Sequence, residues 1–144
     1  MKYVVLVSHG TFAPGLKNVL EMLAGGDRED VIAVGLENGM GADEFAEKFV
    51  DAISGVKEGD EIILLADIIG GSPLTNAIEQ VSNKGLIENT IIFGGMNLAM
   101  ALTATLMKDA VDKDMLRENL VSEAKDAIKE FVLETSSSDD EDDI

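Results

Sequence analysis

The chain has 144 residues, with 28 acidic against 11 basic side chains and a net charge of −17, and 46% of its residues are hydrophobic. This length suits a single domain, and the acidic surplus argues against binding to nucleic acid or to an anionic membrane, because Lys and Arg make most phosphate contacts. The absence of cysteine excludes disulfide bonds, thiolate metal ligands and a cysteine nucleophile.

Short runs rich in Val, Ile and Leu alternate along the chain with apolar residues at helical spacing. This alternation predicts strands and helices that take turns around a parallel sheet. The expected strands are residues 3–7, 31–36, 61–66 and 90–93. The expected helices run from after Pro14 to Gly25, from Phe45 to near Gly55, from Pro73 to about Lys84, and from Leu98 to Met107.

The C-terminal part shows a longer helical pattern, from Asp112 to about Leu133. Its last three residues, 131–133, fit either the end of this helix or a short extended segment. Residues 135–144 combine a serine run with five consecutive acidic residues, and such a segment has few side chains that can build a core. We therefore expect one domain over residues 1–134 and a disordered acidic tail over 135–144.

The expected fold class is α/β, with a doubly wound, mainly parallel four-stranded sheet of order 2-1-3-4 and helices on both faces. In such a sheet the strand-to-helix loops emerge at the carboxyl edge, and ligands bind where the strand order reverses. The loop after the first strand, residues 8–15, and the loop after the third strand, residues 67–73, are then neighbours. We expect the functional site between these two loops.

The second loop has the residues of an anion-binding helix start. Gly70 and Gly71 allow a tight turn and close approach of a ligand, Ser72 is a preferred N-cap, and Pro73 suits the first helical position. Free amides and the helix dipole then face the anion. Neither loop contains Lys or Arg, so backbone amides and hydroxyl groups must hold any anion that binds there, and a phosphoryl group fits such a site.

A nucleophile is available at the same edge. His9 is the single histidine of the chain, and Asp67 ends the third strand. A carboxylate that accepts a hydrogen bond from one ring nitrogen fixes the tautomer and leaves the lone pair of the other nitrogen free to attack. The chain supplies no obvious metal ligand set, so no metal is expected.

The loop after the fourth strand reaches this edge too, and two interpretations of it stay open. Met96 and Asn97 form a side wall of the site, or the loop is a plain turn in which Asn97 caps the next helix.

At these residues the sequence resembles the enzyme IIA component of the mannose/fructose/sorbose class of the sugar phosphotransferase system (PTS). The resemblance covers residues 1 to about 133. It rests on Val-Ser-His-Gly-Thr-Phe-Ala at 7–13, Asp-Ile-Ile-Gly-Gly-Ser-Pro-Leu-Thr-Asn-Ala at 67–77 and, more loosely, Gly-Gly-Met-Asn-Leu-Ala-Met at 94–100. Many relatives have proline where this chain has Ala99.

The resemblance implies a phosphotransferase component, and we expect it in the cytoplasm because no apolar run is long enough for a membrane span or a secretion signal. His9 would accept a phosphoryl group from the phosphocarrier protein HPr and pass it to a IIB domain, which phosphorylates the incoming sugar. Asp67 would orient His9, and the phosphate would lie against Gly10, Thr11, Gly70, Gly71 and Ser72. The family implies a homodimer in which a C-terminal segment exchanges as a fifth, antiparallel strand; residues 131–133 are the candidate. The resemblance implies no cofactor, neither nucleotide nor Mg²⁺, because the donor phosphohistidine already carries the energy for transfer. It implies no direct membrane insertion either.

Other classes fit the residues less well. A response-regulator receiver domain needs an acidic pair after the first strand, and a class-two chelatase needs more metal ligands than this chain offers. A dihydroxyacetone-kinase phosphotransfer subunit would carry Met-Gly-Ser in the loop after the third strand. A sensor that is phosphorylated on His9 but passes nothing on remains open, because the sequence does not separate carrier from sensor.

Overall fold

The computed structural model describes residues 1–135, so the expected acidic tail lies, from residue 136 on, outside the described residues. The elements in chain order are β1 (Lys2–His9), α1 (Phe12–Ala24), β2 (Val31–Leu36), α2 (Ala42–Ala52), β3 (Glu61–Ala66), α3 (Ser72–Asn83), a 3-10 turn (Ile87–Asn89), β4 (Thr90–Phe93), α4 (Leu98–Met107) and α5 (Lys113–Asp126). In this part of the chain no helix is long and apolar enough to cross a bilayer.

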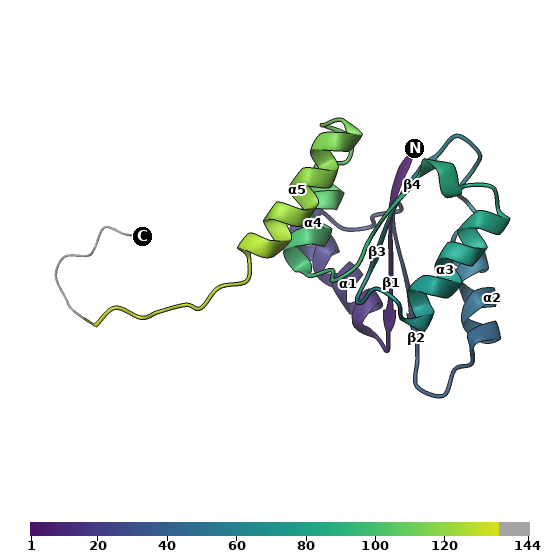
Figure 1. Ribbon diagram of the computed structural model, residues 1–144, viewed down its shortest axis with the longest axis horizontal. Coiled ribbons are helices and arrows are strands. Elements are labelled where there is room, and N and C mark those ends of the chain that lie inside the picture. Colours follow the sequence, from purple (N-terminus) through teal and green to yellow (C-terminus); the bar gives the residue numbers. More distant parts are fainter. Residues whose placement is uncertain (136–144) are drawn as a thin grey trace.

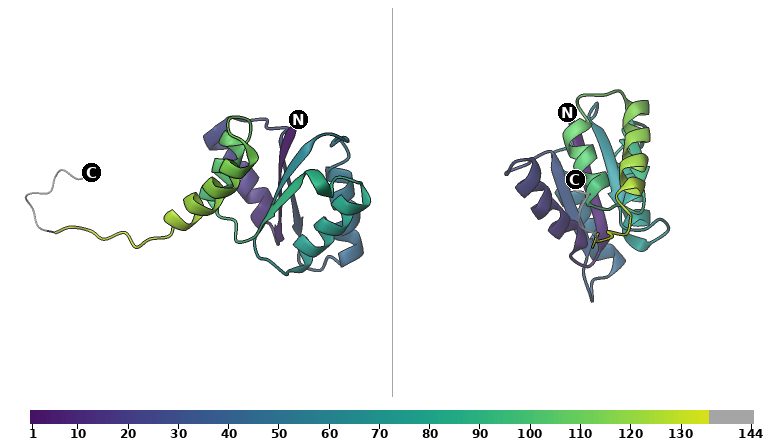
Figure 2. Two further views of the ribbon diagram at one scale, coloured as in Figure 1. Left: turned by 45° about the horizontal axis from the view of Figure 1, so that its top comes forward. Right: turned by 90° about the vertical axis from the view of Figure 1, so that its left-hand side faces the viewer.

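The four strands form one parallel sheet in the order β2-β1-β3-β4, which confirms the predicted topology. Helices α2 and α3 cover one face of the sheet, and α1, α4 and α5 cover the other (Figures 1 and 2). All strands therefore end at the same edge, which lies toward the bottom of Figure 1. Strand order reverses beside β1, so the loops after β1 and β3 meet there.

The core consists of two layers, one on each face of the sheet. Alternate residues of β1 enter different layers: Val4 and Leu6 pack under α1, α4 and α5, whereas Val5 and Val7 pack under α2 and α3. Successive side chains of a strand point to opposite faces, so a strand covered on both faces must be apolar at every position. This explains the unbroken apolar runs of β1 and β3.

The starts of two helices differ from the prediction. Helix α1 begins at Phe12 rather than after Pro14, because the buried hydroxyl of Ser8 accepts a hydrogen bond from the Ala13 amide at 2.7 Å and so caps the first turn. Pro14 fits within this turn, where its missing N–H has no partner to lose. Helix α3 begins at Ser72, with Gly71 in the extended N-cap conformation (φ −86°, ψ 162°), so the predicted N-cap at Ser72 is wrong by one residue.

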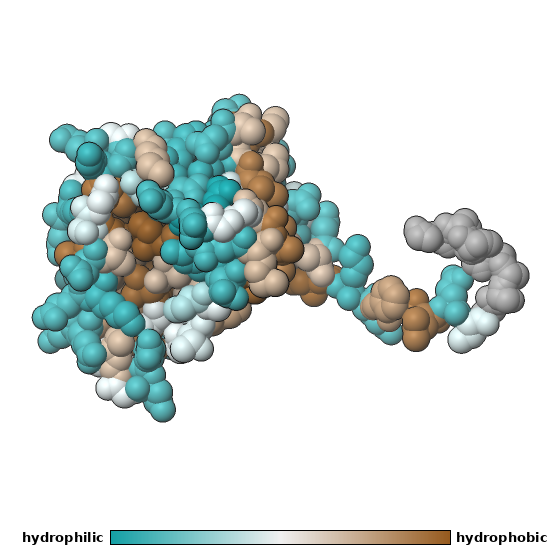
Figure 3. All heavy atoms as spheres, turned by 180° about the vertical axis from the view of Figure 1, so that it is seen from behind, coloured by the Kyte–Doolittle hydropathy of each residue, from teal (hydrophilic) through white to brown (hydrophobic). Residues whose placement is uncertain are grey.

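The predicted helix over 112–133 is too long. Helix α5 ends at Asp126, and residues 127–135 form neither a helix nor a paired strand. Ala124 is the last residue of α5 in the core, whereas Ile128 and Phe131 are 76% and 84% exposed. Without packing, extra helical turns gain little stability. Figure 3 shows hydrophobic side chains on this segment clear of the folded body, and its exchange with a second copy stays a prediction.

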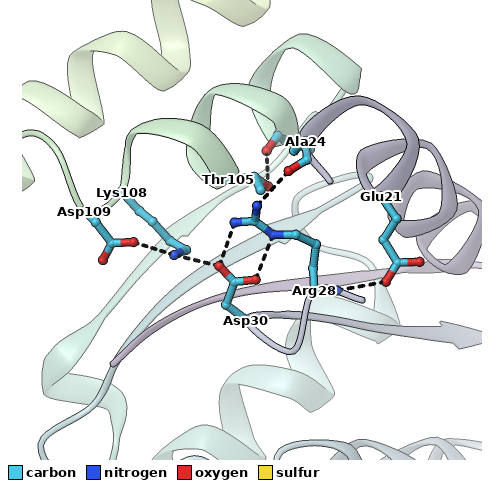
Figure 4. A network of polar contacts seen from close by, with 8 residues as sticks. Glu21, Ala24, Arg28, Asp30, Thr105, Lys108 and Asp109 are labelled. Carbon is cyan, nitrogen blue, oxygen red and sulfur yellow. Dashed lines mark hydrogen bonds and ion pairs between the residues drawn. The ribbon is translucent and has the colours of Figure 1, made fainter. Parts of the chain in front are cut away.

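A network of ionic contacts joins the ends of α1 and α4 to the start of β2 (Figure 4). Arg28 donates two hydrogen bonds to Asp30, at 3.1 and 2.9 Å, and a third to the Ala24 carbonyl at 2.9 Å. The ammonium of Lys108 lies 2.8 Å from a carboxylate oxygen of Asp30 and 2.8 Å from one of Asp109. Only 4% of the Lys108 side chain is exposed. Burial raises the pKa of Asp30, but the hydrogen bonds from Arg28 and Lys108 outweigh it and hold the pKa below the usual range.

Replacing Asp30 with alanine should cost about 3 kcal/mol of unfolding free energy, because it removes one of the two carboxylates that face the buried Lys108 ammonium and both hydrogen bonds between Arg28 and Asp30. Urea unfolding at pH 7 measures this loss, and a loss below about 1 kcal/mol would contradict it. A lowered folded pKa stabilises the protein above the unfolded value, about 3.9 for Asp. The difference between wild type and Asp30→Ala should therefore persist at neutral pH and shrink as the pH falls through the folded pKa.

Candidate functional site

The site begins with a direct contact between the ends of two neighbouring strands. His9 is the last residue of β1, and Asp67 follows the last residue of β3. Oδ2 of Asp67 lies 2.9 Å from the backbone nitrogen of His9 and 2.9 Å from its ring Nδ1. Oδ1 accepts the Ile68 amide at 2.9 Å. The carboxylate therefore holds both the backbone and the ring of His9 in one orientation.

These contacts determine which nitrogen of His9 can react. An ionised carboxylate only accepts hydrogen bonds, so Nδ1 must carry the proton of the neutral ring. The lone pair is then on Nε2. The His9 side chain is 49% exposed, whereas that of Asp67 is 17% exposed. In the neutral tautomer that this contact favours, Nε2 carries the lone pair and lies at the protein surface as a nucleophile.

The ionisation of Asp67 supports this arrangement. Burial raises the pKa of the carboxyl, but hydrogen bonds from the His9 backbone, the His9 ring and the Ile68 amide lower it further than burial raises it. The net pKa is below the usual range, so Asp67 is a carboxylate at neutral pH. A negative charge next to Nδ1 stabilises positive charge that develops on the ring when Nε2 forms a bond.

The first turn of α3 lies against the ring. A Cβ placed on Gly71 would come within 2.9 Å of Cε1 of His9, the carbon between the two ring nitrogens, and within 3.1 Å of the Ile68 side chain. Gly71 is the N-cap of α3, and Thr75 donates the first backbone bond back to it at 3.1 Å. The amides before Thr75 have no partner within the helix, so they and the positive end of the dipole lie beside the nucleophile.

Gly71→Ala should slow the phosphoryl transfer to His9 that the sequence resemblance predicts by about 10²-fold, because displacement of a reacting group by about 1 Å costs that much. Gly41→Ala is the matched control. Gly41 is the N-cap of α2 with nearly the same backbone conformation (φ −84°, ψ 168°), but a Cβ there meets nothing within 4 Å. Both variants should lose similar stability in thermal unfolding. Equal transfer rates in the two variants would show that Gly71 does not position the ring.

The first loop turns tightly after His9. Gly10 has φ +59°, and its amide donates to the Leu36 carbonyl at 2.7 Å. The Gly10 carbonyl sits directly over Gly35 of β2, where a Cβ would overlap it. Thr11 follows as the exposed residue before α1, and no side-chain bond caps the helix there. Gly10 in the loop after β1 and Gly35 in β2 are thus both required for the path of the chain next to His9.

The other predicted site residues divide into two groups. Gly70, with φ +86°, forms the turn before Gly71 and Ser72, so all three lie at the start of α3. Met96, by contrast, is only 4% exposed and packs in the core, so its side chain does not wall the site. Asn97 caps α4 through the Met100 amide at 2.9 Å and donates to the Ala124 carbonyl at 3.1 Å. The plain-turn interpretation of this loop is the one that the structure supports.

Sequence reasoning missed some residues that shape the site. Ser8 is fully buried between His9 and the start of α1, and a polar residue that continues an apolar strand was the available signal. Gly35 supports the first loop from a different strand, and only the three-dimensional structure relates the two. Among residues 1–135, no group of three His, Cys, Asp or Glu side chains is arranged to hold a metal ion.

Comparison with known proteins gives a consistent family. Residues 3–121 match the family described as PTS system fructose IIA component. The PTS system fructose-specific EIIA component of Bacillus subtilis is 27% identical over 117 residues, which are 81% of this chain and 77% of that protein.

Two solved structures have the same fold. The mannose/sorbose-specific IIA subunit from Enterococcus faecalis superposes with a TM-score of 0.77 at 24% identity and covers 95% of this chain and 100% of its own. The PTS IIA protein associated with the fucose utilization operon from Streptococcus pneumoniae gives a TM-score of 0.75 at 26% identity, covering 90% and 92%. Because the family match covers residues 3–121, most of this chain, the chain belongs to the PTS fructose IIA component family.

Proposed function

We propose that this chain carries a phosphoryl group on Nε2 of His9, accepted from phosphorylated HPr and passed to a IIB domain for sugar uptake and phosphorylation. The observation that carries the proposal is the 2.9 Å contact between Nδ1 of His9 and Asp67, which leaves Nε2 free next to the start of α3. Family membership supports a phosphoryl-transfer role in general. The cytoplasmic location belongs to the same proposal.

The transfer step needs no proton movement to solvent. The lone pair of Nε2 attacks phosphorus, and the P–N bond to the donor imidazole breaks, with its electron pair returning to the donor nitrogen. The ring of His9 becomes a phosphorylated imidazolium that keeps its Nδ1 proton and faces the Asp67 carboxylate. Catalysis here consists of in-line positioning and stabilisation of charge. The second transfer, to IIB, is the same step in reverse with a different partner.

The charge on the phosphoryl oxygens has to be met without a basic side chain from these loops. Residues 8–15 and 67–73 contain no Lys or Arg. The unpaired amides at the start of α3 and the hydroxyls of Thr11 and Ser72 are the available donors. Oriented amides at a helix N-terminus suit an anion without requiring a counter-charge.

Apolar side chains flank the nucleophile and suit protein partners. Phe12, Ile68 and Ile69 are 46%, 52% and 77% exposed, and they come from the same two loops as His9 and Asp67. Exposed apolar groups that cluster round a polar centre are typical of protein interaction sites. We propose that HPr and IIB contact these three residues in turn.

Incubation with phosphoenolpyruvate, the general phosphotransfer enzyme and HPr tests the proposal. The expected product is a chain with one phosphoryl group that is labile in acid and stable in base. A chain that takes no label under conditions where a known IIA component is labelled would contradict the proposal.

Addition of a cognate IIB domain separates the carrier from the sensor. A carrier transfers its label to IIB within the time of the assay. A sensor keeps the label on His9, and that result would overturn the second half of the proposal while leaving the first intact.

We further propose a homodimer in which residues 131–133 pair with β4 of a second copy. Among the described residues β4 pairs on one side only, with β3. Beside it lies an apolar groove of about 350 Å³ that Ile69, Ile92, Val121 and Ile128 help to line. Sedimentation equilibrium should give the mass of two chains for wild type and the mass of one chain for Val132→Asp. A wild type with the mass of one chain would refute the dimer.

A further inference from the structure

Asn76, which is outside the predicted site, makes two hydrogen bonds to Ser72. Nδ2 of Asn76 lies 3.1 Å from the backbone carbonyl oxygen of Ser72 and 3.1 Å from its hydroxyl oxygen. A carbonyl oxygen only accepts hydrogen bonds, so the atom that faces it must be the amide nitrogen of Asn76. The orientation of the Asn76 amide is therefore determined by the contact itself. The same nitrogen donates to the Ser72 hydroxyl.

This contact determines what the Ser72 hydroxyl can do. A hydroxyl group has one proton to donate and two lone pairs that accept. The Asn76 amide occupies a lone pair, so the hydroxyl proton must point to another group. Within residues 1–135 the contact with Asn76 is the one side-chain hydrogen bond of Ser72. Its proton thus remains available to an acceptor outside the described chain, such as solvent or a bound anion.

The position of Ser72 brings this proton to the reacting atom. Ser72 is the first residue of α3 and directly follows Gly71, which packs against Cε1 of His9. Cε1 is bonded to Nε2, so a phosphoryl group on Nε2 lies at the same end of α3. The hydroxyl then adds a donor to the free amides of the first turn.

We infer that Asn76 is a positioning residue for phosphoryl transfer: it holds the Ser72 hydroxyl as a hydrogen-bond donor toward the phosphoryl group on His9. The inference rests on the proposed function, in which Nε2 of His9 carries that group. Asn76 does not touch the phosphoryl group itself and acts through Ser72.

The residue type supports this role. Asn is unfavourable inside a helix, because its side chain competes with the backbone for hydrogen bonds. Asn76 lies one turn inside α3 and its side chain bonds back to the first turn. Alanine would favour the helix more, so a structural role in α3 does not account for the choice of Asn. Removal of Asn76 should therefore leave stability unchanged or raise it slightly.

A double-mutant cycle with Ser72 tests the inference. The rate of His9 labelling by phosphorylated HPr should fall about tenfold in Ser72→Ala and about fivefold in Asn76→Ala, since a lost donor in a half-open site costs less than in a closed one. In the Ser72→Ala background, Asn76→Ala should have no further effect. Asn76→Asp should slow transfer more than Asn76→Ala, because a carboxylate accepts the hydroxyl proton and adds negative charge beside the phosphoryl group.

Asn18→Ala, the same substitution at an exposed position of α1, is the control and should label at the wild-type rate. Thermal unfolding of all variants shows that they remain folded. Equal effects of Asn76→Ala in both backgrounds, or a wild-type rate in Asn76→Ala, would overturn the inference while wild type still labels on His9. Absence of label in wild type would instead overturn the proposed function.

Discussion

His9→Gln is expected to abolish acceptance of the phosphoryl group, with a loss of at least about 10³-fold in the labelling rate. The chain has a single histidine and no cysteine, so no second imidazole or thiol can replace it. Glutamine has a similar length and can still donate to Asp67, but its amide nitrogen has no lone pair for attack on phosphorus. The measurement is the amount of acid-labile label after incubation with phosphorylated HPr.

The fold of this variant should remain intact, because half of the His9 side chain is exposed and its contact with Asp67 lies at the surface edge of the sheet. Circular dichroism and urea unfolding check this point. Survival of the acid-labile label in a folded His9→Gln protein would move the acceptor to another residue and end the present account of the site.

Asp67→Asn is the second substitution with a large expected effect, a loss of about 10²-fold or more in the transfer rate. The carboxylate accepts from His9 on one oxygen and from the Ile68 amide on the other. An asparagine amide has one oxygen and one NH₂ group, so in either orientation the NH₂ faces an N–H donor. If the NH₂ faces His9, the ring loses the acceptor that fixes its tautomer, and if the NH₂ faces Ile68, the amide of that residue loses its acceptor. The ring loses the neighbouring negative charge in both cases. Single-turnover labelling measures the rate.

Asp51→Asn is the control for the change of charge, since Asp51 is an exposed residue of α2. It should label at the wild-type rate. A wild-type transfer rate in Asp67→Asn would show that Asp67 does not orient His9 and only stabilises the end of β3.

The effect of Asp67→Asn on the free energy of unfolding should depend on pH. The folded pKa of Asp67 is below its usual value, so its contribution to stability is present above the unfolded pKa, about 3.9, and is lost as the pH falls through the folded value. The stability difference between wild type and Asp67→Asn should therefore persist at neutral pH and shrink as the pH falls through the folded pKa of Asp67.

The strands were predictable because their physical cause is local, and the strand order followed from the doubly wound fold class that their alternation with helices predicts. A strand buried on both faces must be apolar at every position, and β1 and β3 show this directly in the sequence. The helix boundaries depended on tertiary contacts instead. Ser8 caps α1 from the end of β1, and α5 ends where its residues lose contact with the core. Neither contact can be read from helical spacing alone.

The pairing of His9 with Asp67 was predictable for a similar reason. Parallel neighbours place their strand ends side by side, so the two residues had to meet if the sheet order was right. The positions of Gly71 against the ring and of Gly35 under the Gly10 carbonyl were not predictable, because each joins segments whose distance is set by packing. Asn76 had a sequence signal, an unfavourable residue within a helix, whose meaning needed the contact with Ser72.

The most direct test is nitrogen NMR of the phosphorylated protein with labelled histidine. The chain has a single histidine, so its two ring nitrogen signals need no further assignment to a residue. We expect phosphorus coupling on Nε2, with a proton retained on Nδ1 in its hydrogen bond to Asp67. Phosphorus coupling on Nδ1, or ring signals that stay unchanged when the chain is phosphorylated, would contradict the account.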